Sequence, residues 1–305
     1  MTVYQQAAQE LQTVRDFLRF GESILRKHQV TCGHGYAEPW DEVVAIVLHV
    51  LSLPPDSDIR VLDARLMTTE KQEICHFLQQ RAENYLPVAY LTREAWFAGL
   101  LFEVNQHVLI PRSPIAELIE AQFHPWLAAT IEQPKILDLG TGSGCIAISC
   151  AVHLPNATVV ATDISTEALA VAKQNIARHQ VTDRVHLVQS DIWTALPQQT
   201  FDIILSNPPY VAPTEYAQLP KEFQHEPKLG LYAADEGLTI VMEILRHAYS
   251  FLNDQGILIV EVGSAEQALK HRYPELPFYW LSFERGGEGV FLLSKADLGR
   301  INGWK

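Results

Sequence analysis

Apolar runs of strand length alternate with helical stretches from residue 114 onward, and this alternation constrains the fold more than any other feature of the chain. The predicted strands are Lys135–Leu139, Thr158–Thr162, Val185–Gln189, Phe201–Ser206 and Gly256–Val262. Largely apolar runs of this length are typical of parallel strands that are buried on both faces. Helices are predicted between them, for example over Ser165–His179 with Ser165 as the N-cap. We therefore expect an α/β fold with a doubly wound, mostly parallel sheet.

The C-terminal tail departs from this rhythm. Phe278–Phe283 and Val290–Leu293 flank Arg285-Gly286-Gly287-Glu288-Gly289, which is a hairpin turn signal. A parallel sheet that ends in an antiparallel pair resembles the Rossmann-like methyltransferases. The resemblance implies a mostly parallel sheet of about seven strands.

Residues 1–85 show a different pattern, because their apolar side chains recur at helical spacing. Helices are predicted over Ala7–Leu25, Trp40–Leu53 and Thr69–Tyr85. The region contains no cluster of catalytic residue types, and His34, between two glycines, is interpreted as structural. We expect residues 1–85 to form a helical substrate-recognition domain.

Residues 86–113 connect the two patterns. Val88–Leu91, Phe97–Val104 and Val108–Ile110 are interpreted as short strands around turns. The sequence therefore predicts a β-hairpin linker over residues 86–113 and a Rossmann-like domain over residues 114–305.

The composition limits the partners that this chain can have. The net charge is −13 over 305 residues, and acidic side chains outnumber basic ones both in residues 1–85 and in residues 86–305. A protein that grips duplex DNA normally carries a basic footprint, so no direct sequence-specific nucleic-acid binding is expected. The acidity suits a basic protein partner, although it could also serve only solubility.

Other sequence features narrow the setting of the protein. The four cysteines have neither CxxC spacing nor histidine partners at metal-ligand intervals, so no metal site is predicted. The longest apolar stretch, Val43–Leu53, is too short to span a bilayer, and the first residues do not resemble a secretory signal. We expect a cytoplasmic protein with no membrane partner.

A glycine-rich loop directly follows the first predicted strand. Three glycines at alternate positions allow close approach of a ligand and a sharp turn into the next helix. The second and third strands end in aspartates, which could hold a ribose and an adenine amino group respectively. The candidate cofactor residues are Asp138, Gly140, Thr141, Gly142, Ser143, Gly144, Asp163 and Asp191.

The cofactor can be chosen from the chemistry of this loop. A GxGxG loop also suits dinucleotides, but their fingerprint is GxGxxG, and here the third glycine comes one residue early. An acidic pocket of small residues without lysine or arginine is poorly suited to pyrophosphate. It suits S-adenosylmethionine, which carries a sulfonium cation and no phosphate.

The sequence Asn207-Pro208-Pro209-Tyr210 ends the fourth predicted strand. Consecutive prolines cannot continue a sheet ladder, so a rigid loop must form at the carboxyl edge, where ligands bind in open α/β sheets. The Asn207 side-chain oxygen and the Pro208 carbonyl could each accept one N–H of an amide or aryl-amine nitrogen, and Tyr210 could stack on the same planar group. We expect Asn207, Pro208 and Tyr210 to be catalytic and all four residues to bind the substrate.

Together these motifs resemble the family of protein-(glutamine-N5) methyltransferases over nearly the whole chain. The resemblance extends to His225-Glu226-Pro227 and Asp235-Glu236-Gly237-Leu238. It implies that Gly140 to Gly144, Asp163 and Asn207 contact S-adenosylmethionine, and that Asn207 to Tyr210 hold the substrate glutamine.

The family has two main bacterial branches. One modifies the Gly-Gly-Gln loop of peptide release factors and usually reads Pro-Arg-Pro-x-Thr-Glu after the linker. This chain instead has Pro111-Arg112-Ser113-Pro114-Ile115, with Ala116 where that branch has glutamate. These residues resemble the branch that modifies large-subunit ribosomal protein three (uL3). The resemblance implies a basic ribosomal protein as substrate, either free or in an assembling large subunit.

Two further residue sets are assigned less directly. Relatives often have tryptophan immediately after the Ser-Asp of the third strand end, where this chain has Ile192 followed by Trp193, so Trp193 is included as a cofactor-binding candidate. The long segment 211–237 after the four-residue loop is expected to shape the substrate groove.

Three other functions remain open at this point. Release-factor methylation uses the same chemistry on another protein. Adenine-N6 methyltransferases share the Asn-Pro-Pro-Tyr loop and flip the base into it. A non-catalytic, cofactor-binding role in ribosome assembly is the third.

Overall fold

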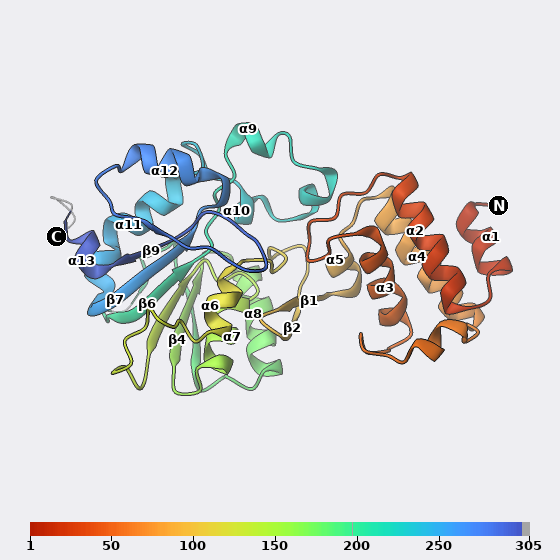
Figure 1. The fold of residues 1–305 in the computed structure, drawn as a ribbon, viewed down its shortest axis with the longest axis horizontal. Helices are drawn as coiled ribbons and strands as arrows, with labels where there is room; N and C mark the ends of the chain where they lie inside the picture. The colour runs from red at the N-terminus through yellow and green to blue at the C-terminus, as the bar shows by residue number, and fades with distance from the viewer. Residues whose placement is uncertain (197, 301–305) are drawn as a thin grey trace. The chain divides into compact units, whose positions relative to one another are not determined.

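The computed structural model describes residues 1–196 and 198–300, and the chain divides into two compact units. Unit 1 comprises Met1–Ala95 together with Pro220–His225. Unit 2 comprises Trp96–Leu219 and the described residues from Glu226 onward. The chain therefore passes from one unit to the other at three points along its length, as the colours of Figure 1 allow the reader to follow.

Unit 1 is helical around one hydrophobic core. Its elements are α1 (Val3–Glu10), α2 (Val14–Lys27), α3 (Pro39–Val50), η1 (Ile59–Asp63), α4 (Thr68–Glu83), α5 (Val88–Thr92) and η2 (Lys221–His225). Phe17, Leu25, Ile46, Ile74 and Leu78 are fully buried in its core.

The prediction of one helix over Ala7–Leu25 is wrong, because α1 and α2 are separated at Leu11–Thr13. Thr13 opens α2 with a capping box, in which its hydroxyl accepts from the Asp16 amide and Asp16 accepts from the Thr13 amide. The cap satisfies backbone groups that a continuous helix would have used, so the chain breaks there.

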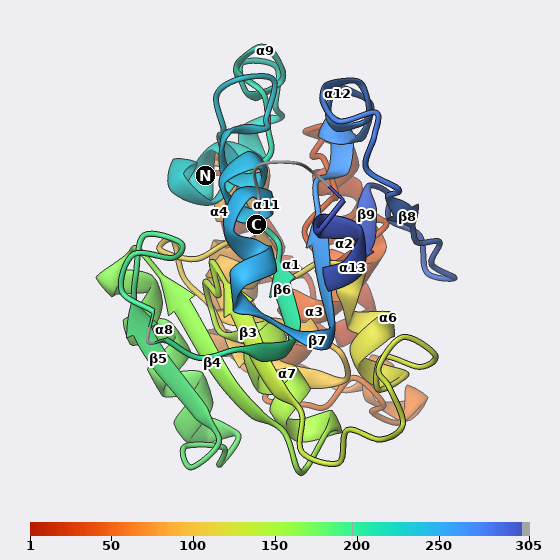
Figure 2. The same ribbon diagram turned by 90° about the vertical axis from the view of Figure 1, so that its left-hand side faces the viewer.

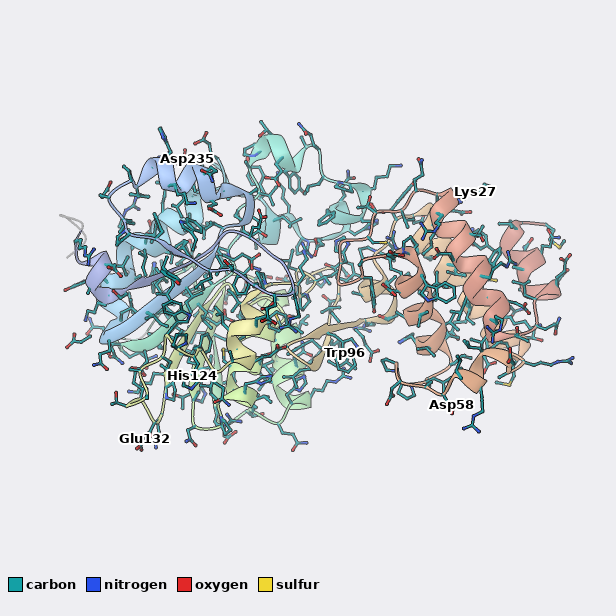
Figure 3. All side chains as sticks on the ribbon, viewed as in Figure 1. Lys27, Asp58, Trp96, His124, Glu132 and Asp235 are labelled. Atoms are coloured by element: carbon teal, nitrogen blue, oxygen red, sulfur yellow. The ribbon has the colours of Figure 1, made fainter. Side chains whose placement is uncertain are left out.

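The linker contains a hairpin, but its strands are fewer than expected. Val88–Leu91 is helical, since the Pro87 carbonyl accepts from the amides of Tyr90 and Leu91. The strands β1 (Glu94–Phe97) and β2 (Leu100–Glu103) surround an Ala98-Gly99 turn with φ of 47° and 74°. Trp96 lies exposed on β1 (Figure 3), and Val108–Ile110 is not a strand.

Unit 2 contains a seven-stranded sheet of order β5-β4-β3-β6-β7-β9-β8. Its strands are β3 (Lys135–Leu139), β4 (Thr158–Asp163), β5 (Val185–Gln189), β6 (Phe201–Ser206), β7 (Leu252–Glu261), β8 (Tyr279–Trp280) and β9 (Val290–Ser294). The first five are parallel, whereas β9 runs antiparallel to both β7 and β8. All five predicted parallel strands and the antiparallel ending are thereby confirmed.

Helices cover both faces of this sheet (Figure 2). One face packs against α6 (Ile115–Glu120), α7 (Cys145–His153) and α8 (Thr166–Arg178). The other packs against α11 (Thr239–Phe251), α12 (Glu266–Arg272) and α13 (Lys295–Leu298). Alternate strand residues serve the two faces, as Ile136 and Leu137 of β3 do.

The strand order reverses direction between β3 and β6, which are neighbours in the sheet but distant in the sequence. Ligands of open α/β sheets bind in the crevice that such a switch point creates at the carboxyl ends of the strands. Short elements follow two of these strands in the sequence. After β6 come α9 (Pro213–Tyr216) and α10 (Lys228–Leu231), and after β7 comes η3 (Gly263–Ala265). Over the described residues, no helix has the length and apolar character needed to cross a bilayer.

Candidate active site

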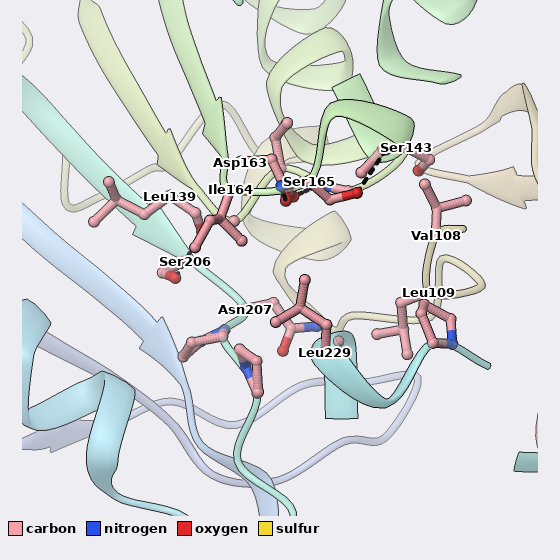
Figure 4. A pocket seen from close by; sticks show the side chains of 18 of the residues that line it. Val108, Leu109, Leu139, Ser143, Asp163, Ile164, Ser165, Ser206, Asn207 and Leu229 are labelled. Atoms are coloured by element: carbon pink, nitrogen blue, oxygen red, sulfur yellow. Dashed lines mark hydrogen bonds between the residues drawn. The ribbon is translucent and has the colours of Figure 1, made fainter. Parts of the chain in front are cut away.

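A cavity of about 350 Å³ opens at this switch point, within unit 2. It is lined by the loops that follow β3, β4, β5 and β6 (Figure 4). The predicted residues that line it are Gly140, Thr141, Gly142, Ser143, Asp163, Asp191, Asn207, Pro208 and Pro209. The structure thus brings together the glycine loop and most of the four-residue loop after β6.

The glycine loop takes backbone conformations that only glycine adopts easily. Gly140, Gly142 and Gly144 have φ of 73°, 55° and 81°. A Cβ atom on Gly140 or Gly142 would meet no heavy atom within 4 Å, so open space lies in front of both. A Cβ on Gly144 would approach Ile148 and Ala172 at 3.0 and 3.2 Å, so this residue serves helix packing rather than the cavity.

Two buried polar side chains of this loop are incompletely satisfied. Asp138 Oδ2 accepts from the Thr141 hydroxyl at 2.6 Å, whereas Asp138 Oδ1 and Ser143 Oγ have no hydrogen-bond partner within residues 1–196 and 198–300. Burial raises the pKa of Asp138 to about 7. Asp138 belongs to β3 and does not line the cavity, whereas Ser143 does. An unsatisfied hydroxyl at a cavity wall is what a polar ligand would complete.

Asp163 is held as an acceptor beside the glycine loop. Its two oxygens accept from the backbone amides of Gly142 and Ser165, both at 2.9 Å (Figure 4). Burial raises its pKa, although these amide bonds oppose the rise. The remaining lone pairs of this half-buried carboxylate suit a vicinal diol. Asp191 also lines the cavity and is exposed.

The cavity differs from expectation in one respect, because Arg112 lines it. Its guanidinium is engaged by Glu226 through two hydrogen bonds of 2.7 and 2.8 Å. Although burial opposes its charge, the Glu226 carboxylate raises the pKa of Arg112. Arg112 thus stays protonated and its charge is balanced by Glu226, so the cavity still suits a phosphate-free cofactor such as S-adenosylmethionine.

The loop after β6 is fixed to the glycine loop's strand. The Ser206 hydroxyl donates to the Leu139 carbonyl at 2.8 Å, which joins the ends of β6 and β3. Asn207, Pro208 and Pro209 then line the cavity, with Asn207 half-buried. Tyr210 does not line it, since its hydroxyl donates to Glu261.

Trp193 also lies away from the cavity lining. Its ring stacks on Phe251 with centroids 4.7 Å apart, and its indole N–H donates to the Glu243 carbonyl at 3.0 Å. The strand-end position alone could not show this, because the indole found its partners on α11. The structure gives no support for a cofactor contact by Trp193.

Several lining residues were not named individually from the sequence. Val108, Leu109 and Ile110 come from the end of the linker, and Pro227, Leu229 and Gly230 come from segment 211–237, which was expected to shape the substrate groove. Glu226 links the two segments, because it accepts from the Ile110 amide as well as from Arg112. The His225-Glu226-Pro227 and Pro111-Arg112 motifs were the available signal for this wall of the cavity.

Known proteins resemble this chain over almost its full length. Residues 123–228 match the model of the methyltransferase small domain. The ribosomal protein uL3 glutamine methyltransferase of Francisella tularensis is 43% identical over 94% of this chain and 92% of its own length. The protein of the same name from Xanthomonas campestris is 46% identical over 96% of this chain and 94% of its own length.

The fold has solved counterparts as well. The hMettl16 catalytic domain, in complex with a MAT2A 3′UTR hairpin, aligns with a TM-score of 0.51 and 16% identity. The alignment covers 82% of this chain and 91% of that domain. At this identity the likeness concerns the fold alone, and it agrees with the Rossmann-like methyltransferase architecture that the sequence predicts.

Proposed function

The chain belongs to the family of ribosomal protein uL3 glutamine methyltransferases, and on that premise we propose that it methylates a glutamine side chain of ribosomal protein uL3. The methyl donor is S-adenosylmethionine and the acceptor is the side-chain amide nitrogen. A ribosomal-protein substrate supports a cytoplasmic setting for the reaction, because such proteins are made and assembled there.

One observation carries the proposal beyond family membership. The glycine loop and Asp163, which suit the donor, line the same cavity as Asn207 and Pro208, which suit a primary amide. Donor and acceptor residues at one switch point allow in-line transfer by positioning alone.

The cavity residues form two sets, one for the cofactor and one for the substrate glutamine. The cavity-facing atoms of Gly140 to Ser143 and the Asp163 carboxylate would hold the cofactor. When bound, S-adenosylmethionine supplies an electrophilic methyl group on a sulfonium sulfur. The loop after β6 would bind and orient the glutamine opposite that position.

Orientation matters because an amide nitrogen is a poor nucleophile, its lone pair being delocalised. The Asn207 side-chain oxygen and the Pro208 carbonyl each accept one N–H, so the lone pair is directed toward the donor and its delocalisation is opposed. As the nitrogen gains the methyl group, the methyl–sulfur bond breaks to leave a neutral thioether, and the nitrogen releases one proton to solvent. The four-residue loop contains no histidine or carboxylate, and none is required as a general base before transfer.

The acidic charge and the family favour uL3 over the alternatives. An enzyme that methylates adenine in a nucleic acid would need a basic surface to bind it, whereas the net charge of this chain is −13. Release factors share the acceptor chemistry, but the two relatives described above, which match over 94% and 96% of this chain, are named for uL3.

The test incubates the enzyme and labelled S-adenosylmethionine with free uL3, with both release factors and with nucleic acid in parallel. Mass spectrometry then locates the methyl group. We expect label on one glutamine of uL3, and its loss by about a hundredfold or more in Asn207→Ala. Label confined to release factors or to nucleic acid would overturn the substrate assignment.

The scaffold alternative is tested with the same variant. Asn207→Ala should keep the fold, since the side chain is half-buried at a loop. Labelling of uL3 by this variant at the wild-type rate would contradict the role of Asn207, and wild-type enzyme that labels no protein would favour a non-catalytic role.

A further inference from the structure

Tyr210, the last residue of the loop after β6, is bound to a carboxylate outside the cavity lining. Its hydroxyl donates to Glu261 Oε1 at 3.0 Å, and the Ser113 hydroxyl donates to Glu261 Oε2 at 2.5 Å. Glu261 ends β7 and is only 6% exposed, as is Ser113. Both carboxylate oxygens are therefore occupied by hydroxyl donors in a buried setting.

The strand period explains why Glu261 reaches this position. Ile257 and Ile259 of β7 face the α6 side of the sheet, and Glu261 follows them at the same alternation. Ser113 lies just before α6, and its oxygen also accepts from the Ile115 amide at 3.3 Å. The carboxylate thus joins the end of β7, the start of α6 and the loop after β6.

Glycines surround the tyrosine closely. A Cβ atom on Gly263 would lie 2.5 Å from Tyr210 Cε2, and a Cβ on Gly237 would lie 2.1 Å from the Tyr210 carbonyl oxygen. Both glycines have positive φ, 43° and 84°. Gly263 is itself packed so closely that a Cβ on Gly289 would lie 2.3 Å from the Gly263 carbonyl oxygen. The ring and the backbone of Tyr210 are thereby confined from two sides.

We propose that Glu261, oriented by Ser113, is a positioning residue for the reaction, and that it acts by holding Tyr210 and hence the adjoining Asn207-Pro208 amide clamp. The inference rests on the proposed function, which assigns the clamp. It replaces the expectation that Tyr210 stacks on the substrate, because the tyrosine is engaged by Glu261 and is absent from the cavity lining.

The electrostatics agree with a hydrogen bond of fixed direction. Burial, followed by the charge of Glu261, raises the pKa of Tyr210, so the phenol remains the donor at neutral pH. Burial raises the pKa of Glu261, and the hydrogen bonds from Ser113 and Tyr210, followed by the Arg112 charge, oppose that rise. Because the Tyr210 phenol donates to a buried carboxylate that Ser113 also holds, the backbone of the Asn207–Tyr210 loop has few conformations available.

The test is a double-mutant cycle on methylation of purified uL3. Tyr210→Phe deletes the donor, and Glu261→Leu deletes the acceptor at similar side-chain size. We expect each single variant to lower kcat about tenfold and the double variant to lower it no further, with KM for uL3 changed less than about twofold. Glu261→Gln keeps an acceptor oxygen for the phenol and should recover kcat to within about threefold of wild type.

Controls separate positioning from folding. Tyr279→Phe removes an exposed hydroxyl of the same unit and should leave kcat unchanged. Cofactor affinity, measured by calorimetry, should be the same in Tyr210→Phe as in wild type. If Glu261→Leu does not fold, Ser113→Ala takes its place in the cycle, with the same non-additivity expected because it releases the second carboxylate oxygen.

The possible outcomes are distinct. Additive losses in the double variant, or unchanged kcat in both single variants, would overturn the positioning role while the proposed function stands. Wild-type enzyme that leaves uL3 unmodified would overturn the proposed function and this inference with it.

Discussion

Asp138, in β3 just before the glycine loop, shows how one residue can set a pH dependence. Its carboxylate is fully buried and only one oxygen is hydrogen-bonded to a side chain, the Thr141 hydroxyl. Burial raises its pKa to about 7 from the ordinary 3.8. The folded protein therefore binds this proton more tightly than the unfolded chain does.

The stability of the protein should follow from that difference. Because the folded-state pKa is raised, the stabilising contribution of the protonated group is fully present below the unfolded pKa and is lost as pH rises to about 7. Asp138→Asn is neutral at all pH values and keeps an oxygen for Thr141, so its stability relative to wild type should increase between about pH 4 and pH 7. Urea unfolding of both proteins across this range is the measurement, and parallel pH profiles would refute the assignment.

The sequence predicts which residues line the cavity where the backbone alone determines their position. It does not predict this where a partner distant in the sequence determines where the side chain lies. Asp163 and Asn207 line the cavity because strand ends of a parallel sheet meet at one edge. Tyr210 and Trp193 stand at comparable strand-end positions, yet Glu261 holds one and Phe251 stacks on the other. Neither partner is near its tyrosine or tryptophan in the sequence, so no local pattern could have indicated these contacts.

At the scale of elements, one buried side chain connects three of them. Asn175 of α8 donates to the Glu103 carbonyl of β2 and to the Ser143 carbonyl of the glycine loop, both at 2.9 Å. Its side-chain oxygen accepts from the Glu103 amide at 2.7 Å. The hairpin, the helix and the glycine loop thus share a single amide that is wholly buried.

Removing this amide should destabilise unit 2 substantially. Asn175→Ala removes the three hydrogen bonds that this side chain makes to backbone groups, and we expect the free energy of unfolding to fall by about 2–4 kcal/mol. Lys173→Ala, an exposed position of the same helix, is the matched control and should change it by less than about 0.5 kcal/mol. Chemical denaturation measures both, and equal stabilities would show that water replaces the lost bonds.

Helices and strands were predictable from the sequence when their apolar pattern continued without interruption over the whole element. The five parallel strands and α8 with its Ser165 cap agree with the sequence pattern. Val88–Thr92 is a helix because the Pro87 carbonyl closes its first turn. The apolar run Val88–Leu91 is too short to distinguish a helix from a strand. The break before Val14 came from a capping box within otherwise helical spacing.

At the scale of the whole molecule, a segment after the Asn207–Tyr210 loop is built into unit 1. Arg81, fully buried, forms ion pairs with Glu42 at 2.7 Å and with Glu222 at 3.2 Å. Glu222 also accepts from the Thr31 amide at 2.6 Å, and Phe223 packs on His34 with ring centroids 4.4 Å apart. Residues 220–225 therefore belong to the helical unit although they follow β6 in the sequence.

Loss of this anchor should be visible in both stability and protease access. Glu222→Ala removes one of the two carboxylates that pair with the buried Arg81, and Glu42 remains. We therefore expect the free energy of unfolding to fall by about 2 kcal/mol. Limited proteolysis should then cut faster within residues 211–237. Glu73→Ala, an exposed carboxylate of α4, is the control, and identical cleavage rates in both variants would contradict the anchoring.

The net charge of −13 makes a separate prediction about association with uL3. If the basic substrate is steered by the acidic protein, kcat/KM for uL3 should fall by about an order of magnitude between low and high salt. A short glutamine peptide without net charge serves as the control substrate and should show little change. Salt-independent kcat/KM for uL3 would mean that the acidity serves solubility only.

The interleaving of the two units has a consequence for synthesis on the ribosome. A helical domain at the amino end is ordinarily free to fold before the rest of the chain emerges. Here its buried Arg81 meets Glu222 only after more than a hundred further residues, including β6 and the loop that follows it, have been translated. Unit 1 begins to be translated first but is complete only when residue 225 has been made. An amino-terminal fragment ending at the hairpin would lack Glu222, one of the two carboxylates that pair with the buried Arg81.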